Sequence, residues 1–246
     1  SVICDGGSII RGLQQRRKVT VTRVMPTLRD YKTEKVVKLI QGYSRQKVND
    51  LLVVGCGTGL EAAILAQQLG SRVVGIDVVD NFSPESAQYA HLQLGDAMAL
   101  EFADSSFDFV YSYHTLEHIQ DPFLALKEIR RVLREGGEFW IGTPNRRRLL
   151  AYIGSKTATI KQKIWWNLVD WRAKLTGRFR NELGAHAGFS SSELESMLRQ
   201  FFPQVDNMTN SYYEEIYKDR LQLVKTIEKF YLSSLLFPAL YFAGRK

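Results

Sequence analysis

The sequence predicts an α/β protein, and two observations carry this prediction. Residues 55–59, Gly-Cys-Gly-Thr-Gly, follow directly on an apolar strand pattern at 51–54 and precede a helical pattern at 60–69. A second strand pattern, at 72–77, ends in an acidic residue. Strands that alternate with helices across a glycine-rich turn are typical of nucleotide-binding α/β folds.

The glycine-rich turn predicts a ligand site. Glycine permits positive φ and lacks the Cβ that would block a ligand, and the helix that follows presents unpaired N–H groups. The spacing is G-x-G-x-G and differs from the G-x-G-x-x-G of dinucleotide-binding folds. Asp77 lies 22 residues after Gly55, near the distance at which an acid binds ribose hydroxyls in such folds.

The remaining elements follow from apolar patterns along the chain. A third strand at 91–97 carries Asp96 and Ala97 at its end. A helix is expected at 122–134 because its apolar residues share one side. The other strands are expected at 107–112, 138–143, 205–209 and 237–244, with further helices beginning at Ser190 and covering 212–230.

Three further motifs follow the glycine-rich turn in order: LEHxxDP at 116–122, RVLREGG at 131–137 and TPN at 143–145. Together with the turn, they resemble the class I S-adenosylmethionine-dependent methyltransferases. The resemblance covers about residues 48–145 closely, and 186–202 and 241–246 loosely. The family includes ubiquinone-pathway, sterol, sugar, antibiotic and cell-surface glycan methyltransferases. The motifs therefore indicate the reaction and leave the acceptor open.

The resemblance implies a Rossmann-like methyltransferase fold. Its doubly wound, seven-stranded sheet is mostly parallel, and the last strand is antiparallel and lies between its neighbours. The chain then divides into an N-terminal basic segment (1–30), a cofactor-binding core (31–145), a helical basic insertion or lid (146–185), and the C-terminal part of the core sheet (186–246) with a helical insertion at 211–230.

S-adenosyl-L-methionine is the implied cofactor, and S-adenosyl-L-homocysteine is the implied product. Asp77 would accept hydrogen bonds from both ribose hydroxyls, because a carboxylate has only acceptors. Asp96 would accept one from the adenine amino group. The residues implied to hold the cofactor are Gly55, Cys56, Gly57, Gly59, Asp77, Val78, Asp96, Ala97, Ser112 and Tyr113.

The candidates for a catalytic base are His114, His118 and His186, because imidazole titrates near neutral pH. Glu117 lies three residues after His114, a spacing that could also hold a divalent metal. Some quinone O-methyltransferases of the resembled branch look to carry E-x-x-EH there; His114 replaces the first acid, so we predict no metal. Local structural bonding is the alternative role for Glu117 and His118.

A length of 246 residues, with 45% hydrophobic and 24% charged residues, predicts one main globular domain. The two cysteines, Cys4 and Cys56, predict no disulfide framework and favour a reducing compartment. The first residues show no signal-peptide pattern, and no apolar run approaches the ~18 residues of a membrane span. We therefore expect a cytoplasmic protein, with peripheral membrane contact left open.

Residues 146–182 hold ten basic and two acidic residues, a net charge of +8 against +7 for the whole chain. A basic lid at this point would favour an anionic acceptor, a nucleic acid or an anionic membrane, and a solvated surface is the alternative. Apolar residues at 160, 164, 168, 171 and 175 recur at helical spacing beside Trp165 and Trp166. Such a helix lies in a membrane interface or, more commonly, packs on its own domain.

Three functions remain open. The first is in-line methyl transfer from S-adenosylmethionine to a small-molecule, lipid-linked or glycan acceptor, with oxygen as the expected acceptor atom. The second is an RNA methyltransferase; the lack of an N-P-P-Y/F-type motif and of an appended RNA-binding module disfavours it. The third is a non-catalytic S-adenosylmethionine-binding or membrane-surface protein, which the intact turn with Asp77 and Asp96 disfavours. The sequence predicts no oligomeric state.

Overall fold

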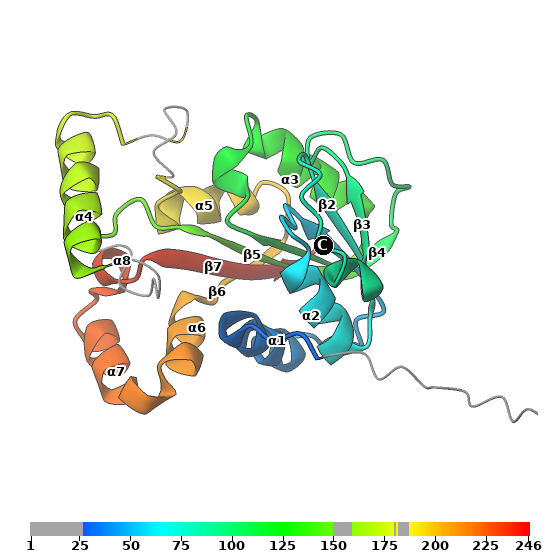
Figure 1. The fold of residues 1–246 in the computed structure, drawn as a ribbon, viewed down its shortest axis with the longest axis horizontal. Coiled ribbons are helices and arrows are strands. Elements are labelled where there is room, and N and C mark those ends of the chain that lie inside the picture. Colours follow the sequence, from blue (N-terminus) through cyan, green and yellow to red (C-terminus); the bar gives the residue numbers. More distant parts are fainter. Residues whose placement is uncertain (1–26, 150–158, 180, 182–186) are drawn as a thin grey trace, which may run out of the picture.

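A seven-stranded sheet with helices on both faces forms the protein, as the computed structural model in Figure 1 shows. The structure describes residues 27–149, 159–179, 181 and 187–246. The strands are β1 (Asp50–Val54), β2 (Arg72–Asp77), β3 (His91–Leu94), β4 (Phe107–Tyr113), β5 (Leu133–Pro144), β6 (Gln204–Asn207) and β7 (Ala239–Arg245).

The strand order in the sheet is β3-β2-β1-β4-β5-β7-β6. The pairings from β3 to β5 are all parallel, whereas β7 runs antiparallel to both of its neighbours, β5 and β6. The predicted doubly wound, mostly parallel sheet with an antiparallel last strand is therefore confirmed. The order reverses between β1 and β4, and such a reversal is where ligands bind in open α/β sheets.

Helices cover the two faces of the sheet and enclose two hydrophobic cores. α1 (Tyr31–Tyr43), α2 (Leu60–Leu69) and α6 (Thr209–Ile216) pack on one face, and α3 (Pro122–Val132) and α5 (Ser191–Leu198) pack on the other (Figure 1). Successive residues of β5 serve opposite faces, because side chains alternate along a strand. Trp140 joins the core beneath α1 and α2, while Phe139 and Ile141 join the core beneath α3 and α5.

Several element boundaries differ from the sequence-based expectation. The predicted helix at 122–134 ends at Val132, because Leu133 already pairs with Phe107 at the start of β5. The strand predicted at 237–244 is β7, which begins only at Ala239, after the short helix α8 (Ser233–Leu236). The segment 212–230 divides between α6 and α7 (Leu221–Lys229). α1 was not predicted from the sequence, although the side chain of Asp30 caps its first turn.

The predicted helix in the basic segment is present as α4 (Ile160–Leu175) and lies at the same end of the molecule as α7 and α8 (Figure 1). Its apolar stripe does not pack on the rest of the protein. Ile160, Ile164, Leu168 and Leu175 are all exposed. The interpretation that this stripe packs on its own domain is therefore wrong. No helix in the described part of the chain has the length and apolar character needed to cross a membrane.

Candidate active site

The three glycines of the turn between β1 and α2 all adopt positive φ, but they have different surroundings. A Cβ on Gly55 would lie 2.0 Å from Oγ1 of Thr115, so this glycine permits close packing. A Cβ on Gly59 would lie 2.3 Å from the Leu92 side chain. A Cβ on Gly57 would meet nothing within 4 Å, so this glycine alone of the three faces open space.

The carboxylate of Asp77, at the end of β2, organises the glycine-rich turn. Its Oδ2 accepts a hydrogen bond from the Gly57 N–H at 2.8 Å, and its Oδ1 accepts one from the Val79 N–H at 3.0 Å. A carboxylate has about four lone-pair sites, so Asp77 retains acceptor capacity for a ligand. Asp77 and Gly57, 20 residues apart in the sequence, therefore form one structural unit at the carboxyl ends of the strands.

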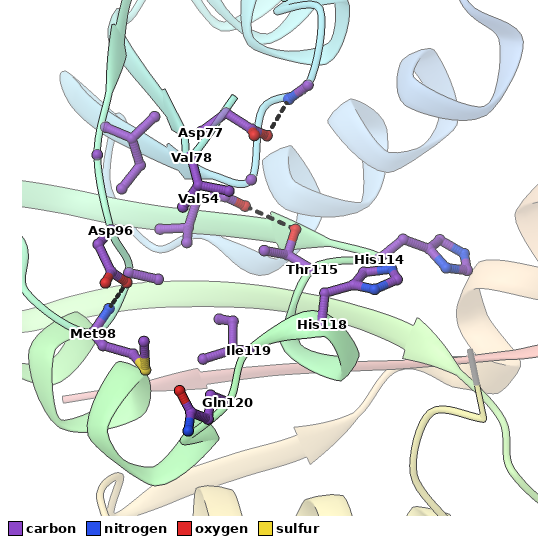
Figure 2. A pocket seen from close by; sticks show the side chains of 15 residues that line it. Val54, Asp77, Val78, Asp96, Met98, His114, Thr115, His118, Ile119 and Gln120 are labelled. Atoms are coloured by element: carbon purple, nitrogen blue, oxygen red, sulfur yellow. Dashed lines mark hydrogen bonds between the residues drawn. The ribbon is translucent and has the colours of Figure 1, made fainter. Parts of the chain in front are cut away.

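A cavity of about 600 Å³, the first cavity, opens at the carboxyl ends of β1, β2 and β4. Figure 2 shows Asp77, Val78 and Asp96 toward one side of it and His114 and His118 toward the other. Its lining residues are Val54, Gly55, Gly57, Ile76, Asp77, Val78, Gly95, Asp96, Ala97, Met98, His114, Thr115, His118, Ile119 and Gln120.

Most of the predicted cofactor residues meet in the first cavity, and four do not line it. The Cys56 side chain is buried beside Gly75, and burial raises the pKa of its thiol to about 12. Gly59 is the N-cap residue of α2 and packs on Leu92. Ser112 is buried within β4. Tyr113 lines a second, aromatic cavity.

The predicted histidines lie around a buried carboxylate. Oε1 of Glu117 lies 3.2 Å from Nδ1 of His114 and 3.9 Å from Nε2 of His118. Its Oε2 accepts a hydrogen bond from the Thr143 hydroxyl at 3.2 Å, and the Glu117 side chain is fully buried. His186 lies outside the described residues. Within the described residues, no group of three or more His, Cys, Asp and Glu side chains could hold a metal ion.

The second cavity, of about 360 Å³, is lined mainly by aromatic rings and is called the aromatic cavity below. Tyr212 stacks on Tyr241 with ring centroids 3.7 Å apart, and the Tyr241 hydroxyl lies 3.4 Å from that of Tyr113. Burial raises the pKa of Tyr113, Tyr212 and Tyr241 above that of an ordinary phenol, which is itself protonated at neutral pH. The cavity is lined by Lys32, Tyr113, His114, Tyr212, Tyr213, Ile216, Tyr217, Arg220, Leu223, Val224, Ile227, Leu236, Phe237, Pro238, Ala239 and Tyr241.

His114 lines both cavities, and its backbone is in the left-handed region with φ of +54°. Its N–H donates to the Gly142 carbonyl of β5 at 2.8 Å, which helps to hold the residue in this conformation. Few residues other than glycine adopt such a conformation, and those that do are often found at functional sites. The imidazole therefore stands at the junction of the two cavities.

Sequence reasoning missed several lining residues. Thr115 lies between the cavity and Gly55, and its hydroxyl donates to the Val54 carbonyl at 3.2 Å. Glu61 lines an opening beside the glycine-rich turn together with Gly57 and Tyr113. Burial raises the pKa of Glu61 to about 7. Its place in the first turn of α2, directly after the glycine-rich turn, was the available signal.

A sequence model of the methyltransferase domain family matches residues 52–141. The chain is 38% identical over 100 residues to the O-methyltransferase resE of Aspergillus sclerotiorum, covering 37% of this chain and 38% of that protein. It is 39% identical over 100 residues to a demethylmenaquinone methyltransferase of Staphylococcus epidermidis, covering 37% of this chain and 42% of the relative. The chain therefore spans less than half the length of these relatives.

Solved structures share the fold at low identity. The phosphoethanolamine N-methyltransferase 2 of Haemonchus contortus in complex with S-adenosyl-L-methionine has a TM-score of 0.54 and 19% identity, over 87% of this chain and 52% of that one. A methyltransferase of Thermotoga maritima, described as a possible histamine N-methyltransferase, has a TM-score of 0.52 and 18% identity, over 87% and 89% of the two chains.

The fold and the glycine-rich turn define a class I methyltransferase domain. The chain carries a domain of the S-adenosylmethionine-dependent methyltransferase family, whose cofactor is S-adenosyl-L-methionine. The residues of the first cavity fit this cofactor. Open space lies over Gly57, and the carboxylates of Asp77 and Asp96 flank the exposed side chain of Val78.

Proposed function

We propose that the protein transfers a methyl group from S-adenosylmethionine to the hydroxyl of a small-molecule or lipid-linked acceptor bound in the aromatic cavity. The observation that carries this proposal is that His114 lines both cavities. A side chain at this junction can reach a group on either reactant. The cofactor would occupy the first cavity, with Asp77 at its ribose and Asp96 at its adenine.

The bound cofactor supplies an electrophilic methyl group on a sulfonium, and the chain's own residues position and deprotonate the acceptor. Nδ1 of His114 is engaged by Glu117, so Nε2 is the nitrogen that accepts the hydroxyl proton. Because Glu117 is buried and held by Thr143, it fixes the orientation of the ring and stabilises the imidazolium that forms.

The lining of the aromatic cavity supports an acceptor with a flat or apolar body. Stacked tyrosine rings favour aromatic or unsaturated ligands. Lys32 and Arg220 add positive charge to the lining, which suits an acceptor that carries an anionic group. The names of the relatives agree with this choice, since one is an O-methyltransferase and another acts on demethylmenaquinone.

The basic segment gives limited support to the RNA methyltransferase alternative. Arg146 pairs with Glu193 at 3.0 Å, and the buried Arg148 pairs with Asp170 at 3.3 Å. These cations are engaged within the protein. No described residue of 146–182 lines either the first or the aromatic cavity, so the lid over the acceptor site stays a prediction.

Labelled S-adenosylmethionine incubated with the protein and with separate lipid, aqueous and RNA extracts tests the proposal. We expect label in a lipid or small-molecule product that carries a new methyl ether. Label in RNA would instead support the nucleic-acid alternative. Tight cofactor binding by calorimetry with no labelled product in any fraction would support the non-catalytic alternative.

A further inference from the structure

α4 is attached to the rest of the protein through its polar side. Asp170 pairs with Arg148, and Trp171 Nε1 donates to the Leu149 carbonyl at 2.6 Å. Lys174 Nζ also donates to the Arg148 carbonyl. The one buried residue within the helix is Asn167, a polar residue. Apart from the indole N–H of Trp171, these contacts come from the polar residues of the helix.

The opposite side of α4 is apolar and open to solvent. The stripe residues recur at intervals of four, four, three and four, which places them on one helical face. Trp165 and Val169 are also exposed, and on a helical projection Lys161 and Arg172 lie between them and the stripe. Exposed fractions are 76% for Ile160, 57% for Ile164, 65% for Trp165, 47% for Leu168, 48% for Val169, 40% for Trp171 and 89% for Leu175.

This orientation is the reverse of the one found in ordinary globular helices, which bury the apolar side and expose the polar side. Contiguous exposed apolar surface marks a site of interaction with a protein or a membrane. The apolar face of α4, defined by the seven residues above, therefore needs a partner that the described chain does not provide.

The charges among the apolar residues favour an anionic bilayer as that partner. Lys161 and Arg172 are both exposed, and on a helical projection both lie at the edge of the apolar stripe, between it and Trp165. Long basic side chains can bury their stems in an interface and keep the charge in water. A second copy packed through the same face would bring these cations together, which disfavours a dimer there.

We infer that α4 binds the surface of an anionic phospholipid membrane, with its apolar face in the headgroup region and its axis parallel to the surface. Tryptophan, aliphatic side chains and adjacent lysine or arginine residues are the composition of such interfacial helices. The helix lies on the membrane and does not cross it, in keeping with the absence of a spanning helix in the described chain.

The position of α4 links the membrane contact to the proposed acceptor site, and this step rests on the proposed function. The Leu149 N–H donates to the Leu235 carbonyl of α8 at 2.7 Å, and the next residue, Leu236, lines the aromatic cavity. Phe230 and Tyr231, between α7 and α8, are also exposed. The acceptor class that fits this arrangement is lipid-linked or dissolved in the membrane.

Vesicle flotation of the whole protein tests the membrane contact without requiring methyl transfer. We expect the wild type to bind vesicles of phosphatidylcholine with phosphatidylglycerol more than vesicles of phosphatidylcholine alone. The double variant Ile164→Ser with Leu168→Ser should bind about tenfold less or weaker still, because two apolar side chains no longer enter the interface. Lys161→Gln with Arg172→Gln should remove only the preference for anionic vesicles.

The matched control is Leu94→Ser with Leu124→Ser, which removes two exposed leucines outside α4 and should leave vesicle binding unchanged. Calorimetry with S-adenosylmethionine shows whether each variant is folded and retains its cofactor site. Wild-type protein that binds neither kind of vesicle would overturn the inference. So would a wild-type dimer that the Ile164 and Leu168 changes convert to monomer without altering vesicle binding.

Discussion

Nδ1 of His114 lies 3.2 Å from Oε1 of Glu117, which belongs to a short 3-10 helix (Leu116–His118) after β4. The Glu117 side chain is fully buried, whereas that of His114 is 41% exposed. The contact thus joins an accessible imidazole to an inaccessible carboxylate. This geometry resembles the general arrangement in which a buried acid orients a catalytic imidazole.

The first prediction concerns His114 as the base. His114→Asn keeps a residue that tolerates positive φ and removes the imidazole. We expect kcat to fall by about 10²–10⁴-fold, the usual contribution of general base catalysis, with little change in cofactor affinity. Turnover and calorimetry measure the two effects separately. His91→Asn, at an exposed position on β3, is the control and should retain full activity.

The second prediction concerns Asp77. Asp77→Ala should weaken S-adenosylmethionine binding by about 3 kcal/mol, roughly 100-fold, because two hydrogen bonds to a charged group are lost. The same change also removes the acceptor for the Gly57 N–H, so the turn loses an internal contact. Calorimetry should show normal affinity for Asp80→Ala, an exposed acid three residues along the chain. Equal affinities in the two variants would exclude Asp77 from the cofactor site.

The third prediction separates ligand contact from backbone strain at Gly57. Gly57→Val should abolish cofactor binding, because a branched side chain would occupy the open space over the turn and resist positive φ. Gly70→Val is a matched control: its φ is +65°, and a Cβ there also meets nothing within 4 Å, but it ends α2 away from both cavities. Both variants should lose similar thermal stability, and only Gly57→Val should lose binding.

The sheet and the turn could be predicted because their signals are local. An apolar strand, a glycine-rich turn and a helical pattern adjoin in the sequence. Asp77 closes β2, and Asp96 follows Gly95 just after β3, which ends at Leu94 and not at the predicted residue 97. The aromatic cavity could not be predicted in this way. Tyr113 and Tyr241 meet across 128 residues, and no local pattern indicates that their hydroxyls adjoin.

The orientation of α4 shows a second limit of sequence patterns. Helical spacing identified the apolar stripe, but spacing does not say which side of a helix faces the protein. Here the Arg148–Asp170 ion pair and the hydrogen bond from Lys174 to the Arg148 carbonyl attach the polar side. Likewise, three glycines in one motif appeared equivalent. Thr115 and Leu92, both distant in sequence, decide that only Gly57 faces open space.

The last prediction concerns Glu61 and the pH dependence of stability. Burial raises the pKa of this carboxyl from 4.5 to about 7 in the folded protein. Between these two pH values the folded state holds a proton that the unfolded state has lost, so the contribution of Glu61 to stability falls as the pH rises from about 4.5 to about 7.

Glu61→Gln should remove this loss, because the amide stays neutral at every pH. We expect the difference in the free energy of urea unfolding, variant minus wild type, to increase by about 2–3 kcal/mol as the pH rises from 5 to 8. Comparing the two proteins at each pH cancels the contributions of the other carboxylates. Glu101→Gln, at an exposed position, should show no such pH-dependent difference. A wild type and a Glu61→Gln variant with parallel stability curves across this range would mean that Glu61 is ionised in the folded protein at pH 5.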